Sequence, residues 1–308
     1  MSESTLDIFV TVWVVLLGAV VGSFLNVVIA RVPHGESVVA PRSRCPRCGS
    51  GIAWYDNIPI LSWLLLRARC RTCGEPISWR YPLVEALGAA VALTAFARHG
   101  LAAGALAEFF FVALLIALAF IDLDTWLLPH ALTWPLIALG LGLSAIGLTP
   151  AASAGSSALG AAVGFGSFAG IAWIGARAFG KEALGWGDVW LLGGLGAWLG
   201  IGALLPVVLF ASIQGSVFGV ALILLGKAQP GPAEGVEESA VPPESASPRV
   251  DDPPASKPAA PPDLSAEGDW VPPRNAVPFG PFLVAGALEW LYLAEPLGEA
   301  VPFLRIFG

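Results

Sequence analysis

Runs of about 20 apolar residues recur along most of this 308-residue chain, and no other feature constrains its fold as strongly. One such run is long enough to cross roughly 30 Å of hydrocarbon as a helix. Hydrophobic residues make up 56% of the chain and charged residues only 13%, whereas a soluble domain carries roughly 25% charged residues. The composition therefore excludes a soluble globular enzyme and predicts an all-α polytopic membrane protein.

The hydropathy pattern predicts about eight transmembrane helices along the chain. The first run has no small-residue cleavage site and continues directly into a basic loop, so we expect an uncleaved anchor rather than a signal peptide. The predicted spans are 8–30, 82–97, 101–121, 131–148, 158–178, 187–200, 203–226 and 280–294.

Lysine and arginine are distributed unevenly between the loops. The loop after the first run contains eight arginines and three acidic residues, and the positive-inside rule places such a loop in the cytoplasm. When eight spans are threaded from there, 14 of the 16 basic residues fall on the cytoplasmic side. This asymmetry supports the number of spans and predicts that the N-terminus lies outside.

The expected domain organisation follows from the spans and the loops between them. We expect a small zinc-stapled loop domain on the cytoplasmic side and a transmembrane core that carries the chemistry. The predicted segments are a first transmembrane helix at 1–30, the cytoplasmic loop domain at 31–81, the core at 82–228, a linker at 229–277 and a last transmembrane helix at 278–308.

The linker differs in composition from the rest of the chain. Between residues 229 and 273, nine residues are acidic and two are basic, which accounts for the whole formal net charge of −7. The same stretch contains 12 of the 26 prolines and almost no large apolar residue before Trp270, so it buries too little surface to fold. We expect a disordered cytoplasmic linker that serves as spacing, with recruitment of substrate or partner as the alternative.

All four cysteines lie in the first cytoplasmic loop, as two Cys-x-x-Cys pairs with 21 residues between them. Two such pairs supply four thiolates to a tetrahedral Zn²⁺, and the glycine after each pair suits the tight turn of a knuckle. The alternatives are disulfides, which a reducing cytoplasm disfavours, and a thioredoxin-like redox pair, which lacks a surrounding βαβ pattern. With four protein ligands the metal has no open coordination position. We therefore predict a structural zinc site whose ligands are Cys45, Cys48, Cys70 and Cys73.

Acidic residues within membrane spans are energetically costly and usually functional. The third span ends with Asp122 and Asp124, shortly before Pro129, and the sixth span begins with Asp188 after two glycines. These span ends lie on the same side of the membrane, so two distant segments deliver carboxylates to one level. The other acids within the predicted spans are Glu85, Glu108 and Glu289.

A close pair of aspartates is the arrangement of an aspartic protease. Like charges in a poorly solvated site cannot both ionise, so one carboxyl holds a proton while the other activates a water for attack on a peptide carbonyl. The three histidines are scattered and no serine lies in a Gly-x-Ser-x-Gly elbow, so no other hydrolytic set competes. The alternatives for the aspartates are helix capping or interfacial placement, and an ion or proton pathway.

These residues resemble those of the bacterial prepilin peptidases, also called type IV leader peptidases, of the Gly-x-Gly-Asp class of intramembrane aspartyl proteases. The similarity covers nearly the whole chain outside residues 229–273. Each motif is weak alone, but so many in the same order are specific. In chain order they are Gly22-Ser-Phe-Leu-Asn-Val-Val, the two cysteine pairs, Asn57-Ile-Pro-Ile-Leu-Ser62, Arg80-Tyr-Pro-Leu-Val-Glu85, Ile121-Asp-Leu-Asp through Leu128-Pro129, Gly185-Trp-Gly-Asp188 and Pro278-Phe-Gly-Pro-Phe282.

The resemblance implies a bifunctional enzyme of the bacterial inner membrane. It implies removal of the short basic leader from type IV prepilins or type II secretion pseudopilins, followed by N-methylation of the new terminal residue with S-adenosylmethionine as methyl donor. The catalytic aspartates then correspond to Asp122 and Asp188 at the cytoplasmic face, with Asp124 as the second choice for the partner of Asp188. The lipid bilayer is a further expected partner, and no nucleic-acid partner is expected.

The residues of the methyl-transfer half are not identified by a motif, because no glycine-rich Rossmann fingerprint follows a strand. The resemblance points to the first cytoplasmic loop and its surroundings. Glu85, one turn inside the second span, is the candidate cofactor-binding residue, and an ion pair between Glu85 and Arg80 is the alternative. His130 stands where the family commonly has Asp or Asn, and the linker before Pro278 is unusually long. For the whole chain, the alternatives are a peptidase without methyltransferase activity and a membrane transporter or scaffold with a zinc-stapled loop.

Overall fold

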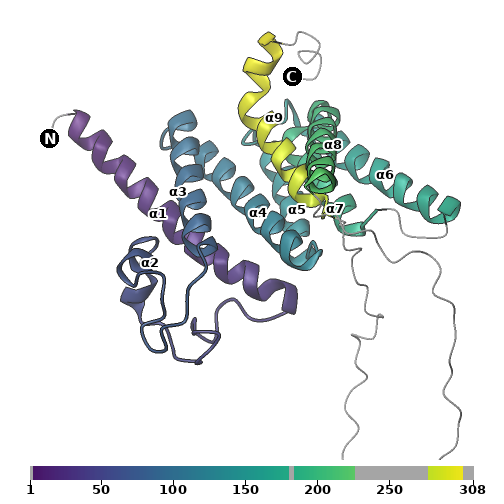
Figure 1. Cartoon of the computed structure of the whole chain (residues 1–308). Coiled ribbons are helices and arrows are strands. Elements are labelled where there is room, and N and C mark those ends of the chain that lie inside the picture. Colours follow the sequence, from purple (N-terminus) through teal and green to yellow (C-terminus); the bar gives the residue numbers. More distant parts are fainter. Residues whose placement is uncertain (1–2, 180–183, 226–276, 301–308) are drawn as a thin grey trace, which may run out of the picture. The chain divides into compact units, whose positions relative to one another are not determined.

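The computed structural model describes residues 3–179, 184–225 and 277–300 (Figure 1). Within these residues the regular structure is helical, apart from two isolated β-bridges in the first loop, so the all-α prediction is confirmed. Two short 3₁₀ helices, η1 Val32–His34 and η2 Trp54–Asn57, lie in that loop. The α-helices are α1 Glu3–Arg31, α2 Leu61–Leu65, α3 Arg80–His99, α4 Ala103–Thr125, α5 His130–Ser144, α6 Ala154–Phe179, α7 Trp186–Leu199, α8 Ile201–Leu224 and α9 Gly280–Ala300.

Each of the eight predicted spans overlaps one α-helix. Among the described helices, α1, α4, α6 and α8 are long and apolar enough to cross a membrane, and α5 and the first part of α9 are shorter apolar helices. The protein is therefore a multi-pass membrane protein. The predicted linker at 229–273 lies outside the described residues.

Helix α7 differs from the other predicted spans in length and burial. It has 14 residues and is therefore about 21 Å long, shorter than the hydrocarbon layer. Its residues from Val189 to Leu199 are buried apart from Trp190, which is partly exposed. The sixth predicted span is therefore an internal helix that other helices surround, and its first turn carries Asp188.

Small residues allow the helices to approach one another closely. Helices α1 and α3 pack side by side (Figure 1), and a Cβ on Gly22 would lie 2.7 Å from Cα of Glu85. Helices α6 and α7 meet through Gly160 and Gly196 in the same way, backbone against backbone. Such contacts are typical of membrane helices, whose association depends on close packing because lipid supplies no hydrophobic drive.

Helices α3 and α4 run antiparallel, and ion pairs join them at both ends. Arg80 at the start of α3 pairs with Asp124 in the last turn of α4, at 2.6 Å. At the other end, Arg98 near the end of α3 pairs with Glu108 in the second turn of α4, at 2.9 Å. The first loop, which leads into α3, therefore lies at the C-terminal end of α4, the end that carries Asp122.

The core centres on α4 and α7. Phe111 of α4 and Trp198 of α7 are fully buried and stack with their ring centroids 4.7 Å apart. The indole N–H of Trp198 donates a hydrogen bond of 2.7 Å to the carbonyl of Leu136 in α5, which satisfies the one polar group of that side chain. These contacts fix α7 against α4 and α5, and so fix where Asp188 lies.

Candidate active site and cysteine cluster

Asp122 lies in the last turn of α4, where the helix ends abruptly. Trp126 adopts a left-handed conformation with φ of 58°, and its amide closes the turn on the carbonyl of Asp122. Pro129 then precedes the first residue of α5. The side chain of Asp122 is only 5% exposed, and its Oδ2 has no hydrogen-bond partner among the described residues. A buried acceptor without a partner is unfavourable for stability, so this carboxylate is a candidate for a functional role.

Asp188 reaches the same place from the first turn of α7. The chain enters the helix through Gly185, whose carbonyl accepts the amide of Asp188 at 3.1 Å. Gly187 packs against the segment that follows α4, since a Cβ there would lie 2.8 Å from Cβ of Leu128. Oδ1 of Asp188 is also buried without a hydrogen-bond partner. The two aspartates lie close enough for a Coulombic interaction between their carboxylates.

Asp124 lies two residues after Asp122 but has a different environment. Its carboxylate is 41% exposed and accepts two contacts from Nη1 of Arg80, at 2.7 and 2.6 Å. The same guanidinium lies 4.8 Å from the ring centroid of Phe120 and donates to the carbonyl of that residue at 3.3 Å. Asp124 therefore has a cationic partner from another helix, which Asp122 lacks among the described residues.

Glu85 is buried in the second turn of α3 and holds the first loop. Its Oε2 accepts a hydrogen bond of 2.7 Å from the amide of Ile60. Ile60 has a φ of 61°, which is rare and strained for a β-branched residue, so the bond to Glu85 supports an unfavourable backbone conformation. Arg80 pairs with Asp124 and not with Glu85, which corrects the ion pair considered from the sequence.

The four cysteines converge in the first loop, as their spacing predicts. All four are free thiols, and their Sγ atoms lie within 4.8 Å of one another. The Sγ atoms of Cys45 and Cys73 are 3.8 Å apart. Sulfur atoms about 2.3 Å from a tetrahedral zinc lie about 3.8 Å from each other. The cluster is therefore a group of side chains that can hold a metal ion.

Each cysteine pair forms the same knuckle. The amide of Cys45 donates to the carbonyl of Ser50, and the amide of Cys70 donates to the carbonyl of Glu75, at 2.9 and 2.8 Å. In both knuckles the following glycine has a φ near 70°, and its amide returns to the carbonyl of the first cysteine. Glycine adopts this left-handed conformation without steric penalty, which explains its place after each pair.

Ion pairs connect the knuckles to each other and to the rest of the loop. Arg47 of the first knuckle pairs with Glu75 beside the second at 3.0 Å. Arg71 of the second knuckle donates two hydrogen bonds to Asp56 in η2, at 2.8 and 2.6 Å. The Arg71 guanidinium lowers the pKa of the Asp56 carboxyl below its usual value. The loop is thus held by polar and thiol contacts.

Apolar side chains of the loop do not form a core of their own. Trp54 is 81% exposed and Leu65 is 73% exposed. Trp63 is an exception, because it is only partly exposed and its indole N–H donates to the carbonyl of Ile77 at 3.1 Å. Most apolar side chains of the loop are therefore exposed rather than packed together.

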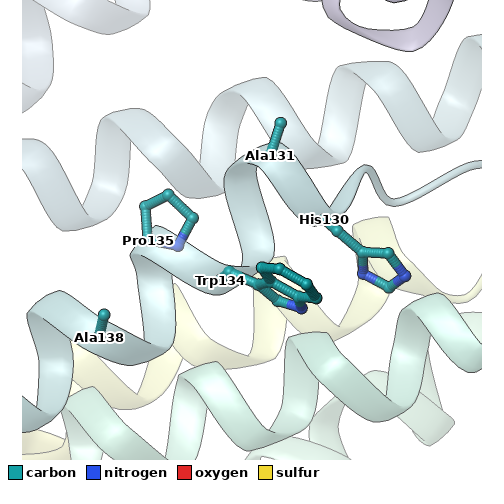
Figure 2. A pocket seen from close by; sticks show the side chains of 5 residues that line it. All are labelled: His130, Ala131, Trp134, Pro135 and Ala138. Atoms are coloured by element: carbon teal, nitrogen blue, oxygen red, sulfur yellow. The ribbon is translucent and has the colours of Figure 1, made fainter.

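His130 lies next to the candidate site, in an aromatic cluster at the start of α5. Its ring stacks on Trp134 and meets Trp190 edge-on, each with centroids 5.5 Å apart. The side of α5 beside these rings borders an open pocket of about 510 Å³. Figure 2 shows the lining residues, which project from successive turns of α5 and include no acid: His130, Ala131, Trp134, Pro135 and Ala138.

Comparison with known proteins agrees with this arrangement. Residues 16–99 match the Bacterial Peptidase A24 N-terminal domain, and residues 109–220 match the Type IV leader peptidase family. The first segment contains the cysteine cluster and the second contains Asp122 and Asp188. No solved structure matches the chain.

Similar proteins share most of their length with this chain. A protein of Myxococcus xanthus (strain DK1622) is 45% identical, over 94% of this chain and 92% of its own length. One of Aeromonas salmonicida (strain A449) is 40% identical over 69% and 81%, and one of Burkholderia pseudomallei (strain 1026b) is 34% identical over 92% and 85%. Each of the three is named a prepilin leader peptidase/N-methyltransferase.

The fold and these comparisons define a multi-pass membrane peptidase. The chain belongs to the type IV leader peptidase family, as its sequence motifs predict. Sequence reasoning did not foresee the ion pair of Arg80 with Asp124, or the contact of Gly280 with Asp122 described below. The charges of the pair were visible in the sequence, but which faces of two helices meet was not.

Proposed function

We propose that this protein cleaves the leader of prepilins and N-methylates the new N-terminal residue, as the names of its relatives imply. We propose Asp122 and Asp188 as the catalytic pair. The observation that carries the assignment is that two helices distant in sequence bring together two acids, each with a buried oxygen that has no hydrogen-bond partner. Asp124 is the weaker candidate, because Arg80 already neutralises it.

The proposed cleavage uses one proton shared between two carboxyl groups. Two carboxylates at close range in a water-poor site cannot both ionise, so one is protonated. The ionised aspartate removes a proton from a water, whose oxygen attacks the scissile carbonyl, while the protonated aspartate donates its proton to the carbonyl oxygen. As the tetrahedral diol collapses, one of its hydroxyl groups gives its proton to the ionised aspartate and the C–N bond breaks. The leaving amine takes the proton of the other aspartate, so the pair again holds one proton.

The proposed location of this chemistry is the cytoplasmic face of the bacterial inner membrane. The arginine-rich first loop is tied to the same end of α4 that carries Asp122, through the pair of Arg80 with Asp124, and basic loops remain cytoplasmic. Leaders of prepilins and of type II secretion pseudopilins are the substrates we propose for this face, with the apolar segment of the substrate in the bilayer. A transporter is disfavoured, because its charged site is expected near the midplane.

For the metal, we propose a structural Zn²⁺ bound by Cys45, Cys48, Cys70 and Cys73. Support comes from the donor set, four free thiols within 4.8 Å of one another on two matching knuckles. When bound, the ion supplies a crosslink and no open coordination position. We propose residues 31–81 as the domain that this crosslink organises, between the first helix and the transmembrane core.

For methyl transfer, we propose S-adenosylmethionine as the donor and the first loop as its surroundings. Glu85 remains the candidate residue, and its contact with Ile60 suggests how it contributes. One carboxylate oxygen is already occupied by the Ile60 amide, so we propose that Glu85 holds the loop in place rather than binding the donor with both oxygens. Glu85→Ala, which removes the acceptor of the Ile60 amide, should then reduce methylation more than leader cleavage.

The proposed function is tested with purified protein in detergent and a purified prepilin, with and without S-adenosylmethionine. Mass spectrometry of the products should show leader removal in both reactions and a methylated N-terminus only when the donor is present. Cleavage without methylation in both reactions would favour the peptidase-only alternative. An intact prepilin in both reactions, with a folded protein and a substrate that a relative cleaves in parallel, would overturn the proposal.

A further inference from the structure

The start of α9 closes over Asp122. Gly280, the first residue of α9, is buried, and a Cβ added to it would overlap Oδ2 of Asp122. The same Cβ would lie 3.5 Å from Cδ1 of Leu128, the residue that Gly187 also contacts. Three segments therefore meet around Asp122: the end of α4 with its following turn, the start of α7 and the start of α9. The third of these lies outside both family-matched segments, 16–99 and 109–220.

The backbone of α9 leaves one amide for this contact. Pro281 has no N–H, and the amides of Phe282 and Leu283 both donate to the carbonyl of Phe279 at 3.1 Å. The amide of Gly280 interacts with the Asp122 carboxylate. The N-terminus of a helix also carries partial positive charge, so the start of α9 is a favourable electrostatic partner for this acid, and the described residues place no cation against it.

Packing prevents α9 from moving away from Asp122. Leu283 and Val284 are 0% and 4% exposed in the core. One turn further, a Cβ on Gly286 would lie 2.6 Å from the carbonyl of Val207 in α8. Glu289 accepts a hydrogen bond of 2.9 Å from the side-chain amide of Gln214, also in α8. Because these contacts fix the helix axis, a side chain at position 280 would have to displace the Asp122 carboxylate instead.

We propose that Gly280 is a positioning residue for leader cleavage, whose lack of a side chain lets its amide orient the Asp122 carboxylate toward Asp188. This inference rests on the proposed function, because it assigns the task of Gly280 through Asp122. The last helix of the chain thereby completes a site whose two acids come from α4 and α7.

Steady-state kinetics of leader cleavage test this role, with Gly280→Ala compared at matched folded amounts with wild type and Gly142→Ala. A Cβ at Gly142, an exposed position of α5, would meet nothing within 4 Å, so this control should cleave like wild type. Misplacing a catalytic group by about 1 Å can reduce the rate about 10²-fold. We expect a loss of kcat of that order for Gly280→Ala, with KM within about twofold of wild type, because substrate contacts are unchanged.

A double-mutant cycle on thermal stability gives a second readout that does not depend on activity. If the added methyl group collides with Asp122, Gly280→Ala should lower the melting temperature in wild type and lower it less in an Asp122→Ala background, where the carboxylate is gone. Equal losses in both backgrounds, or a Gly280→Ala variant with wild-type kcat, would overturn the inference. Cleavage by Asp122→Ala itself would instead refute the proposed function, so the two failures are distinguishable.

Discussion

The two ends of α4 carry buried acids that differ in their cationic partners. Glu108 near the start is 4% exposed and Asp122 near the end is 5% exposed. Oε2 of Glu108 lies 2.9 Å from Nη1 of Arg98 and 2.8 Å from Nε2 of His99, whereas no cation pairs with Asp122 among the described residues. The two acids are equally buried, but only Glu108 has cationic partners. We therefore assign Glu108 to holding the helices together and Asp122 to chemistry.

The surroundings of Glu108 show what a structural acid in this protein looks like. The Arg98 guanidinium lies 5.2 Å from the ring centroid of Tyr292, so the cluster joins α3, α4 and α9 at one end of the bundle. At the other end, Asp124 plays the comparable part through Arg80. Asp122 lies beside the start of α7 and of α9 without such a partner among the described residues, and Gly280 of α9 contributes a backbone amide.

The largest expected effect concerns the first loop, which Glu85 contacts through the amide of Ile60. Cys45→Ser should abolish stoichiometric zinc binding, because structural zinc contributes on the order of 10 kcal/mol to such modules. Bound zinc is measured by mass spectrometry of metals, and loop order by the rate of tryptic cleavage at Arg67 and Arg69. Thr72→Ser, inside the second knuckle but without a thiol, is the matched control and should retain zinc.

The same experiment also distinguishes the two ends of α4. Loss of the metal should loosen the loop and reduce leader cleavage, while the Glu108 cluster keeps the bundle folded. Full zinc content and unchanged proteolysis in Cys45→Ser would contradict the proposed zinc site.

Neutralising each acid in turn tests the roles assigned to Glu108 and Asp122. Glu108→Gln leaves Arg98 and His99 without their partner and should lower stability by about 1–3 kcal/mol, less than for a fully buried pair because both cations are partly exposed. Asp122→Asn removes an uncompensated buried charge and should leave the melting temperature unchanged or raise it. Thermal unfolding in detergent measures both. A larger loss for Asp122→Asn than for Glu108→Gln would show that the two acids have been assigned the wrong roles.

The smallest expected effect is that of the partly exposed pair between Arg80 and Asp124. Asp124→Asn should reduce leader cleavage by about two- to fivefold, because such a pair contributes about 1 kcal/mol or less. The exchanged pair, Arg80→Asp with Asp124→Arg, should recover part of the activity that Arg80→Asp alone loses. Cleavage kinetics of the three variants are measured at matched folded amounts. If Asp124→Asn is inactive and the exchanged pair recovers no activity, Asp124 is catalytic.

Much of this arrangement could be predicted from the sequence, for identifiable reasons. Apolar runs of the length of a membrane predict helices regardless of partners, and each predicted span coincides with a helix. The cysteine spacing predicts a cluster because two knuckles are local structures that need only one tertiary contact, and the cluster is confirmed. Counting spans also predicts that Asp122 and Asp188 lie at one level, and the two carboxyl groups lie close enough to interact.

What could not be predicted depends on how helices are rotated about their axes. Hydropathy places Arg98 and Glu108 near span ends, but it does not show that the helix faces carrying them meet. It also does not show that Arg80 pairs with Asp124 rather than with Glu85. The sixth span was predicted as an ordinary crossing, yet α7 is short and surrounded by other helices. The sequence identified Gly280 only as part of a motif. A glycine that allows close packing cannot be recognised from sequence until the residue it packs against is known.

The most direct test of the central claim is leader cleavage of a purified prepilin by four preparations at matched folded amounts: wild type, Asp122→Asn, Asp124→Asn and Asp188→Asn. We expect Asp122→Asn and Asp188→Asn to be inactive and Asp124→Asn to cleave the leader. If Asp122→Asn cleaves while Asp124→Asn is inactive, the partner of Asp188 is Asp124. If all four preparations cleave, the two-aspartate mechanism is wrong.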